Sequence, residues 1–455
     1  MIRACTLSTP ELGDRSYLLH DGRVGAVIDP QRDVNRIIGI ARSENVRITC
    51  VAETHIHNDY VSGGWALAQQ LGVPYLVAAA EDAHFERRPV VDGDVVDVGR
   101  SFSLRVVATP GHTPHHVSYV ALEDGRPVSV CTGGSMLFGS AGRTDLSGDD
   151  ATVPLAQSQY RSLLLLGLLP DAVSVLPTHG FGSFCSPGAS QDVVASTIAE
   201  QRSENLAFQM DGEDAFVNAL TAGFTAYPSY YARMGEHTRR GTAVPELSPP
   251  PAVAPTDLRA ASLTSAWVVD LRPRADFAQS HLLRTINIEY AVPFTTYLGW
   301  LLPVQATLML MGESDEVVAD AQLSLSRIGI DDIAGSYVGP LPPAALEARV
   351  GSYPVRRFAD LTEKELQSGA IALDVRRQDE WASGHLDQAV HLPLHELQDH
   401  IDEIPPGTLW VHCAAGYRAG IAASLLERAG RQVVLIDGQF ATREVDHHHP
   451  AGKVA

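Results

Sequence analysis

Cysteine is scarce in this chain, and long apolar runs are missing. The 455 residues include five cysteines, an odd number without Cys-x-x-Cys spacing, which argues against a disulfide scaffold. The longest apolar stretches, Leu163 to Leu169 and Leu298 to Met311, are shorter than the about 20 residues of a membrane-spanning helix. The first residues lack the apolar core of a signal peptide. We therefore expect a cytoplasmic protein with no membrane partner.

Positive charge is also limited. Lys and Arg total 34 against 54 Asp and Glu, so the formal net charge is −20 with neutral histidine. Nucleic acids and anionic membranes bind clustered Lys and Arg, and an acidic chain is a poor partner for either. The 45% of apolar residues is enough for several buried cores, and about 150 residues per domain suggests three domains.

Two proline-rich segments divide the sequence. The first spans residues 244–255 and the second residues 339–343, and both favour extended linkers over helices or strands. We expect a first domain over 1–245, a second over 256–339 and a third over 355–455.

The second and third domains contain a repeat. Val269-Asp270-Leu271-Arg272 corresponds to Leu373-Asp374-Val375-Arg376, and Ser280-His281-Leu282 corresponds to Gly384-His385-Leu386. The offset is 104 residues at each position, from 269 to 373 and from 281 to 385. Each copy reads as a short apolar strand, a helical turn and another strand, so we expect two α/β domains of one type.

In the first domain, short apolar runs end at polar residues and predict a layered α/β sheet structure. We expect a helix at 64–71 and strands at 47–52, 75–78, 104–108, 117–121, 128–131 and 172–176.

Histidines follow several of these predicted strands. His55, His57 and Asp59 stand together in residues 54–60, while His112 and His179 follow later strands. Imidazole and carboxylate groups are ligands for zinc and ferrous iron. The pattern favours a metal pocket over capping or surface histidines.

These motifs resemble the metallo-β-lactamase superfamily, in particular its glyoxalase II-like and persulfide dioxygenase branch. The resemblance covers nearly all of residues 1–245 and implies an αββα sandwich. Gly142-Arg143-Thr144-Asp145 is similar to a persulfide dioxygenase segment in which the arginine lies near the thiol substrate. By this resemblance, Arg143 is a candidate substrate-binding residue.

Two departures from that family affect the metal. Tyr60 replaces a second-site histidine, and Gly134 replaces the metal-binding aspartate. We expect at most one divalent metal, Fe(II) or Zn(II), with a metal-free domain as the alternative. The candidate ligands are His55, His57 and His112, followed by Asp59 and His179. We also expect Gly134→Asp to raise iron occupancy where the backbone accepts a side chain.

The third domain has a candidate nucleophile in Cys413, which ends the apolar segment 409–412. A predicted helix over 421–428 follows, and a helix N-terminus favours a thiolate and binds anions. Arg418 can contact a bound anion or close the loop. The loop residues that line this candidate site are Ala414, Ala415, Gly416 and Tyr417.

This loop resembles the Cys-x-x-Gly-x-Arg active loop of rhodaneses, and the resemblance spans about 356–440. In the second domain Gly312 stands at the position of Cys413, so that copy resembles an inactive rhodanese. The family implies a Cys413 persulfide, with low-molecular-weight thiol persulfides, thiosulfate or sulfite as partners. By family analogy we also expect a homo-oligomer formed through the first domain.

Three functions remain open for the whole chain. The first is a sulfur-handling enzyme with persulfide dioxygenase-like and sulfurtransferase activities. The second is a glyoxalase II-type thioester hydrolase fused to a sulfurtransferase, which needs a metal-bound hydroxide. The third is a non-catalytic first domain that binds a persulfide or a partner and delivers it to Cys413.

Overall fold

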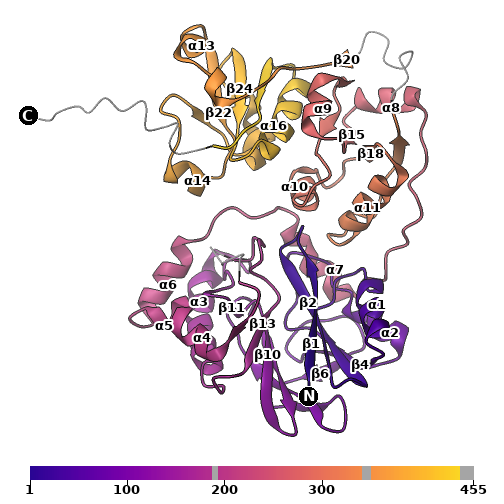
Figure 1. Ribbon diagram of the computed structural model, residues 1–455, viewed down its shortest axis with the longest axis vertical. Coiled ribbons are helices and arrows are strands. Elements are labelled where there is room, and N and C mark those ends of the chain that lie inside the picture. The colour runs from indigo at the N-terminus through magenta and orange to yellow at the C-terminus, as the bar shows by residue number, and fades with distance from the viewer. Residues whose placement is uncertain (187–192, 341–349, 441–455) are drawn as a thin grey trace, which may run out of the picture. The chain divides into compact units, whose positions relative to one another are not determined.

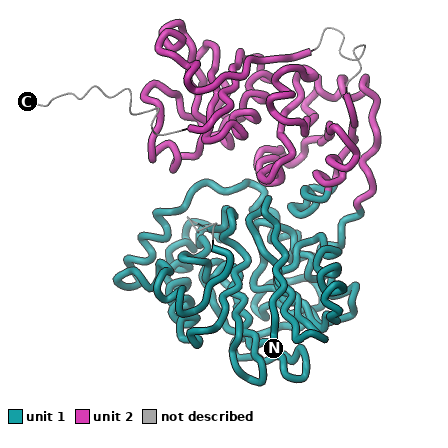
Figure 2. Tube along the Cα trace, viewed as in Figure 1, with its two compact units in different colours: residues 1–246, 323–331 teal, residues 247–322, 332–455 magenta. Residues whose placement is uncertain are grey.

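The computed structural model describes residues 1–186, 193–340 and 350–440. These residues form two compact units (Figure 2). Unit 1 contains Met1–Glu246 and Leu323–Asp331, and unit 2 contains Leu247–Gln322 and the residues from Asp332 onward. Most of the second proline-rich segment lies outside the described residues.

Unit 1 contains two mixed six-stranded sheets. The first has the order β1-β2-β3-β4-β5-β6, and the second has the order β14-β13-β10-β9-β8-β7. The strands of the first sheet are β1 (Arg3–Thr9), β2 (Asp14–His20), β3 (Val24–Ile28), β4 (Arg47–Ala52), β5 (Tyr75–Ala78) and β6 (Arg88–Val90). Those of the second are β7 (Val95–Asp97), β8 (Phe102–Ala108), β9 (Val117–Glu123), β10 (Arg126–Gly133), β13 (Ser174–Pro177) and β14 (Ser196–Thr197), and a separate hairpin joins β11 (Met136–Leu137) to β12 (Ser140–Ala141).

Helices cover the outer faces of both sheets, which gives the αββα layering expected from the sequence (Figure 1). Successive side chains of a strand point to opposite faces of the sheet, so each strand contributes side chains both to the core between the sheets and to the layer of helices. Tyr17 and Leu19 lie in the core between the sheets, while Leu18 packs toward the helices. The helices are α1 (Asn35–Ser43), α2 (Gly64–Leu71), α3 (Asp149–Leu166), α4 (Ile198–Glu204), α5 (Leu206–Gln209), α6 (Glu213–Ala222) and α7 (Tyr231–Arg240).

A segment from the predicted second domain belongs to unit 1. The residues Leu323–Asp331 include the end of α11 (Asp315–Ser326). The Arg327 guanidinium donates two hydrogen bonds to Asp33 Oδ2, at 2.7 and 3.0 Å, and also pairs with Glu11. The sequence did not indicate this, because an arginine after an amphipathic helix usually reads as a solvated end.

Unit 2 contains two parallel sheets with matching strand orders. The first runs β17-β15-β18-β19, and the second runs β23-β22-β24-β25 with β21 added at the end. The first sheet's strands are β15 (Trp267–Asp270), β17 (Ile286–Asn287), β18 (Leu308–Gly312) and β19 (Gly335–Val338). The second sheet's strands are β21 (Val355–Arg356), β22 (Ala370–Asp374), β23 (Val390–His391), β24 (Thr408–His412) and β25 (Val433–Ile436).

Helices flank these two sheets, and a small strand pair lies beside them. The helices are α8 (Pro255–Ser262), α9 (Arg274–Gln279), α10 (Phe294–Leu301), α13 (Glu363–Gln367), α14 (Gln378–Ser383), α15 (Leu397–His400) and α16 (Tyr417–Arg428). The strand pair joins β16 (His281–Leu282) to β20 (Val350–Gly351). Short 3-10 turns occur at Phe358–Asp360, Leu394–Glu396 and Ile401–Glu403.

The two sheets of unit 2 also share side-chain contacts at the 104-residue offset. Arg272 pairs with Asp270 and donates to the Ser280 carbonyl, as Arg376 pairs with Asp374 and donates to the Gly384 carbonyl. The equivalent arginines therefore close equivalent turns. The exact domain boundaries within this unit remain a prediction.

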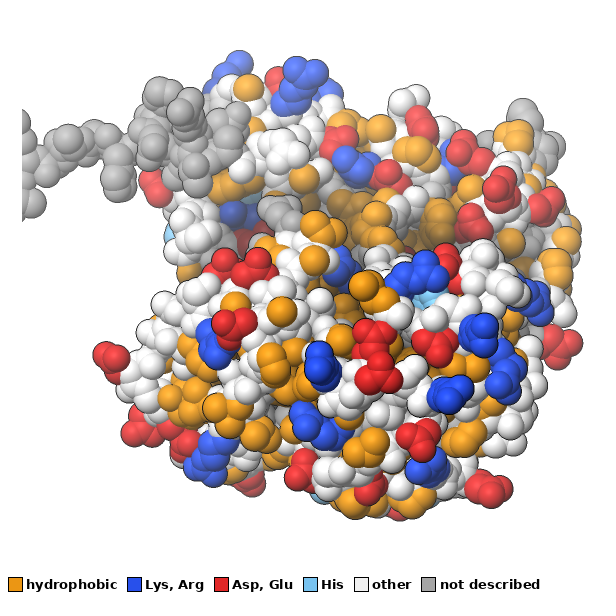
Figure 3. All heavy atoms as spheres, turned by 60° about the horizontal axis from the view of Figure 1, so that its bottom comes forward, with side chains coloured by type: hydrophobic (Ala, Val, Ile, Leu, Met, Phe, Trp, Pro, Cys, Tyr) orange, Lys and Arg blue, Asp and Glu red, His pale blue; other side chains and the backbone are white. Residues whose placement is uncertain are grey.

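No helix among the described residues is long and apolar enough to cross a membrane. On the face drawn in Figure 3, Lys and Arg side chains alternate with Asp and Glu rather than forming one block.

Candidate functional site

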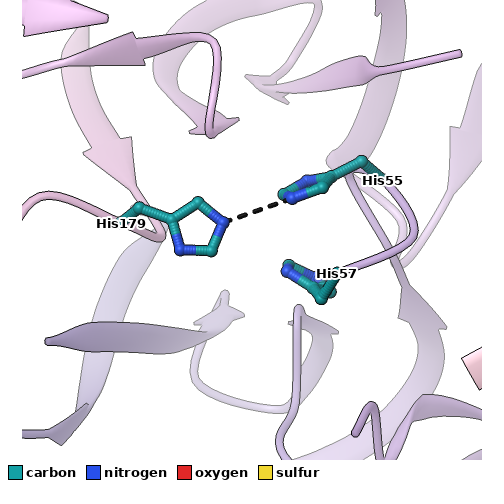
Figure 4. Close-up of side chains that lie close together, drawn as sticks. All are labelled: His55, His57 and His179. Atoms are coloured by element: carbon teal, nitrogen blue, oxygen red, sulfur yellow. Dashed lines mark hydrogen bonds between the residues drawn. The ribbon is translucent and has the colours of Figure 1, made fainter. Parts of the chain in front are cut away.

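Four strand ends of unit 1 bring its candidate site together. His55 follows β4, His112 follows β8, Gly134 follows β10 and His179 follows β13. The imidazole rings of His55, His112 and His179 have mutual centroid distances of 4.9 to 5.3 Å. Figure 4 shows His179 and His55 approaching each other beside His57.

Hydrogen bonds fix the orientation of these three rings. His112 Nδ1 donates to the Arg143 carbonyl at 2.7 Å, and its Nε2 is buried without a hydrogen-bond partner. His179 Nδ1 faces Asp14 at 2.8 Å, while its Nε2 lies 3.2 Å from His55 Nε2. His55 Nδ1 contacts the Thr54 hydroxyl at 2.9 Å. Each ring therefore has an outer partner for Nδ1 and turns Nε2 inward, the arrangement typical of metal-ligating histidines.

His57 has a different environment. Its Nε2 lies 3.0 Å from a Glu53 oxygen and 3.4 Å from an Asp29 oxygen, and the Tyr60 hydroxyl is 3.1 Å away. Burial lowers the pKa of His57, but Asp29 and Glu53 outweigh it and raise that pKa to about 9. The carboxylates therefore occupy Nε2, whereas His57 Nδ1 is buried without a hydrogen-bond partner and is the nitrogen left for a metal.

The candidate ligands form more than one group of close donor atoms. His55, His57 and His179 make one group, and His112, His179 and Cys185 make another. Within each group the ligand atoms lie within 4.8 Å of one another. The structure thus places His179 in both groups and does not gather His55, His57 and His112 into one.

Sequence reasoning missed several participants in this site. Asp14 orients His179, Asp29 binds Thr54 and faces His57, and Cys185 lies beside His112 and His179. Asp29 follows β3 as the histidines follow their strands, which was the available signal, whereas Asp14 is the first residue of β2. Cys185 had none, because it lies outside the named helices and strands, six residues after His179.

The surroundings of Gly134 leave no space for the aspartate that the resemblance implies at this position. A Cβ at Gly134 would lie 2.1 Å from His112 Cδ2, and a Cβ at Gly142 would lie 2.7 Å from His112 Nδ1. The His112 ring therefore occupies the space that a side chain at position 134 needs. The condition set for a gain in metal occupancy by Gly134→Asp, that position 134 accepts a side chain, is therefore met only if the His112 ring moves.

The residues present fit a divalent metal through nitrogen and sulfur donors. The inward Nε2 atoms and the orphaned His112 Nε2 are observations that favour an ion at this position. The same residues do not form the site of two histidines and one carboxylate that the resemblance implies, because Gly134 has no side chain and supplies no carboxylate.

A cavity of about 410 Å³ opens beside these loops. Its lining includes Asn58, Thr113, Tyr227, Tyr231 and Arg239. Asn58 lies between His57 and Asp59 in the sequence, and Thr113 follows His112, so two lining residues are chain neighbours of the candidate ligands.

Arg143 is buried, and its guanidinium bonds to protein groups. It pairs with both Asp145 oxygens at 2.7 Å and donates to the Phe184 and Thr225 carbonyls. Its guanidinium carbon lies 4.4 Å from the Tyr227 ring centroid. Arg143 thus positions Tyr227, which lines the cavity, and its direct contact with a substrate remains a prediction.

Cys413 lies in unit 2 at the end of β24, and α16 begins four residues later at Tyr417. The sequence had predicted the helix from residue 421, so its N-terminus is closer to the thiol than expected. Gly416 makes the close turn possible with a φ of +89°, and a Cβ there would lie 2.0 Å from an Asp437 oxygen. The first N–H groups of α16 lack intrahelical acceptors, so they are available to an anion beside Cys413.

Arg418 is fixed on the first turn of α16. It makes two hydrogen bonds to Glu380, at 2.5 and 2.6 Å. Burial raises the pKa of Glu380, but the bond from Arg418 outweighs it and lowers that pKa. Of the two roles expected for Arg418, this geometry favours closing the loop.

Two family models match separate parts of the chain. Residues 11–179 match the metallo-beta-lactamase superfamily, and residues 358–442 match the rhodanese-like domain family. The chain joins a metallo-beta-lactamase domain to a rhodanese-like domain.

Individual relatives resemble different parts of the chain. A metallo-beta-lactamase structure from Staphylococcus aureus has a TM-score of 0.67 and 28% identity, over 74% of this chain and 99% of that one. The human mitochondrial persulfide dioxygenase ETHE1 is 29% identical over 44% of this chain and 71% of its own length. A hydroxyacylglutathione hydrolase from Rhodopseudomonas palustris is 34% identical over 36% of this chain, which spans 62% of that relative.

The rhodanese-like domain receives contacts from the preceding part of unit 2. Arg274 pairs with Asp437 at 2.9 Å and with Glu289 at 2.7 Å, and its side chain lies against Gly420. The Tyr417 hydroxyl donates to the Glu289 carbonyl at 2.8 Å. These contacts support the start of α16 from outside the domain.

Proposed function

We propose that this protein is an enzyme of sulfane-sulfur metabolism that transfers sulfur through a persulfide on Cys413. The observation that carries the proposal is the position of Cys413 between the end of β24 and the N-terminus of α16. The thiol meets an anion-binding turn there, and the Arg418–Glu380 pair supports that turn.

The transfer is a pair of balanced substitutions. The Cys413 thiolate attacks the outer sulfur of thiosulfate, the sulfur–sulfur bond breaks, and sulfite leaves with the bonding electrons. Cys413 then holds one extra sulfur as a persulfide. A second nucleophile, such as cyanide or a low-molecular-weight thiolate, takes that sulfur and restores the thiolate.

The loop residues would bind the anionic substrate and would not react with its sulfur. Backbone N–H groups of Ala414, Ala415, Gly416 and Tyr417 would bind the thiosulfate oxygens or the persulfide. They form a cradle without side-chain charge. Arg418 keeps this cradle closed through Glu380.

We further propose that the metallo-beta-lactamase domain binds low-molecular-weight thiol persulfides in the 410 Å³ cavity. Similarity to persulfide dioxygenases supports this substrate class. His179, which belongs to both groups of close donor atoms, would hold one divalent ion, Fe(II) or Zn(II), together with the other members of one group, and the bound ion would polarise a substrate atom. Arg143 holds Tyr227 at the cavity wall. Because Gly134 supplies no carboxylate, we expect low dioxygenase activity.

Similarity to hydroxyacylglutathione hydrolases favours a second candidate, a thioester hydrolase. Persulfide-dependent oxygen uptake and thioester hydrolysis distinguish the two reactions in the same preparation. If neither reaction occurs while a persulfide still binds, the domain is a binding module that passes the persulfide to Cys413. Association into a homo-oligomer and a cytoplasmic location remain predictions.

The sulfurtransferase proposal is tested by thiosulfate:cyanide transfer in the full chain. Wild type should form thiocyanate and sulfite, and Cys413→Ser should form neither while keeping its circular dichroism spectrum. Cys50→Ser, at a buried cysteine in β4, is the matched control. Transfer that persists in Cys413→Ser would overturn the proposal.

A further inference from the structure

Cys185 is a buried thiol beside the histidines of unit 1, and the proposed function gives it no role. It is fully buried, and its backbone is fixed at both polar groups. Its carbonyl accepts from the Arg143 N–H at 2.9 Å, and its N–H donates to the Ser183 hydroxyl at 3.1 Å. The thiol therefore has a defined position.

Two histidines present nitrogen atoms to this thiol. The ligand atoms of His112, His179 and Cys185 lie within 4.8 Å of one another, and all three residues are buried. His112 Nδ1 is used by the Arg143 carbonyl, so the lone pair of its neutral ring is on Nε2, which has no hydrogen-bond partner. A buried acceptor without a partner is costly, and a cation or a donor at Nε2 would satisfy it.

His179 is prepared in the same way by buried carboxylates. Its Nδ1 lies 2.8 Å from Asp14 and 3.0 Å from Asp59. Carboxylates in this position fix the tautomer and make the inward nitrogen a stronger ligand. Its Nε2 lies 3.2 Å from His55 Nε2, close to the roughly 3.4 Å expected between two nitrogens on one tetrahedral zinc ion.

We propose that Cys185 is a thiolate metal ligand that acts with His112 and His179 and supplies the anionic donor that Gly134 cannot. Two imidazoles and one thiolate favour zinc or cobalt over an iron site built on a carboxylate. Binding releases one proton from the Cys185 thiol and forms one metal–sulfur bond, without any change of oxidation state.

This assignment deepens the proposed function by naming a ligand and the class of metal in the metallo-beta-lactamase domain. It does not require sulfur transfer at Cys413, which belongs to the rhodanese-like domain. The two claims can therefore fail separately.

The test uses Co(II) as the probe in the full-length protein. After removal of metal with a chelator, the chain is titrated with Co(II), and absorption and cobalt content are measured. Wild type should bind one Co(II) per chain and show an intense near-ultraviolet sulfur-to-cobalt band. Cys185→Ser should lose that band and bind Co(II) about 100-fold more weakly or worse. Cys413→Ser should keep both the band and the stoichiometry.

A second measurement does not depend on any variant. X-ray absorption of the zinc-loaded wild type should contain one sulfur neighbour at about 2.3 Å together with nitrogen neighbours at about 2.0 Å. A shell without sulfur, or a cobalt band that persists in Cys185→Ser, would overturn the assignment. Thiosulfate:cyanide transfer measured on the same samples reports on Cys413 alone, so loss of that activity with the band intact would overturn only the proposed sulfur transfer.

Discussion

The Arg418 guanidinium lies in a two-bonded ion pair with the Glu380 carboxylate, at 2.5 and 2.6 Å. Because both side chains are mostly buried, the pair ties the first turn of α16 to α14. We expect Arg418→Ala to destabilise the rhodanese-like domain by about 2 kcal/mol, between the ~1 kcal/mol of exposed pairs and the ~4 kcal/mol of buried pairs that lose one partner.

Urea unfolding measures the stability of each variant, and thiosulfate kinetics measure its KM. Glu380→Gln should have a similar effect on stability, and the double variant should cost less than the sum of the single variants. Arg356→Ala, at an exposed arginine, is the control. A higher KM for thiosulfate with unchanged stability would mean that Arg418 contacts the substrate instead.

Arg274 supports the same loop from the preceding part of unit 2. Its pairs with Asp437 and Glu289 and its packing against Gly420 predict that Arg274→Ala loosens the start of α16. We expect kcat/KM for thiosulfate to fall about tenfold, since small displacements of a reactive group are costly. Arg259→Ala, on α8, is the control. Equal kcat/KM in the two variants would refute a positioning role.

Gly134→Asp should weaken the metal site and the fold. The new Cβ would lie 2.1 Å from His112 Cδ2, so the ring must move. We expect lower Co(II) occupancy and a loss of roughly 2 kcal/mol of stability, typical of overpacked sites. Gly39→Ala, where a Cβ meets nothing within 4 Å, should be tolerated. Higher occupancy in Gly134→Asp would show that a carboxylate fits there.

His412 makes the stability of the rhodanese-like domain depend on pH. Burial lowers its pKa to about 4, with Asp374 and Arg376 acting in opposite directions. Because the folded pKa lies below the unfolded value of about 6.5, the folded state is penalised as pH falls from 6.5 toward 4. The loss approaches about 3 kcal/mol, at about 1.4 kcal/mol per pKa unit.

Urea unfolding between pH 7 and pH 4 tests this dependence. His412→Phe can stack with Phe358 and Phe440, and it should flatten the pH dependence. His400→Gln is a control of opposite sign: the Glu403 hydrogen bond raises the pKa of His400, so its loss should not flatten the pH dependence. A His412→Phe variant that still loses stability as steeply as wild type would contradict the assignment.

Much of the fold could be predicted from local patterns. Helix α2 and strands β4 and β5 have the predicted bounds, because their apolar runs end at glycine, proline or polar residues. The αββα layering followed from a resemblance, and the matching strand orders in unit 2 agree with the 104-residue repeat. The start of α16 was placed too late, because the loop residues carry no helical periodicity while Gly416 sets the turn.

The candidate site was only partly predictable. His55, His112 and His179 stand at strand ends, and that pattern can be read from the sequence. The orientation of His57 toward Asp29 and Glu53 could not, because it depends on burial and on contacts between separate strands. Cys185 and the filled space at Gly134 are likewise tertiary features, which one-dimensional spacing does not encode.

The central claim is that Cys413 carries the transferred sulfur. The most direct measurement is mass spectrometry of the full chain after brief exposure to thiosulfate, with peptide mapping of all five cysteines. The account predicts one added sulfur per chain, located on Cys413, removed by cyanide and absent from Cys413→Ser. An unmodified wild type, or a cyanide-sensitive sulfur that remains in Cys413→Ser, would contradict it.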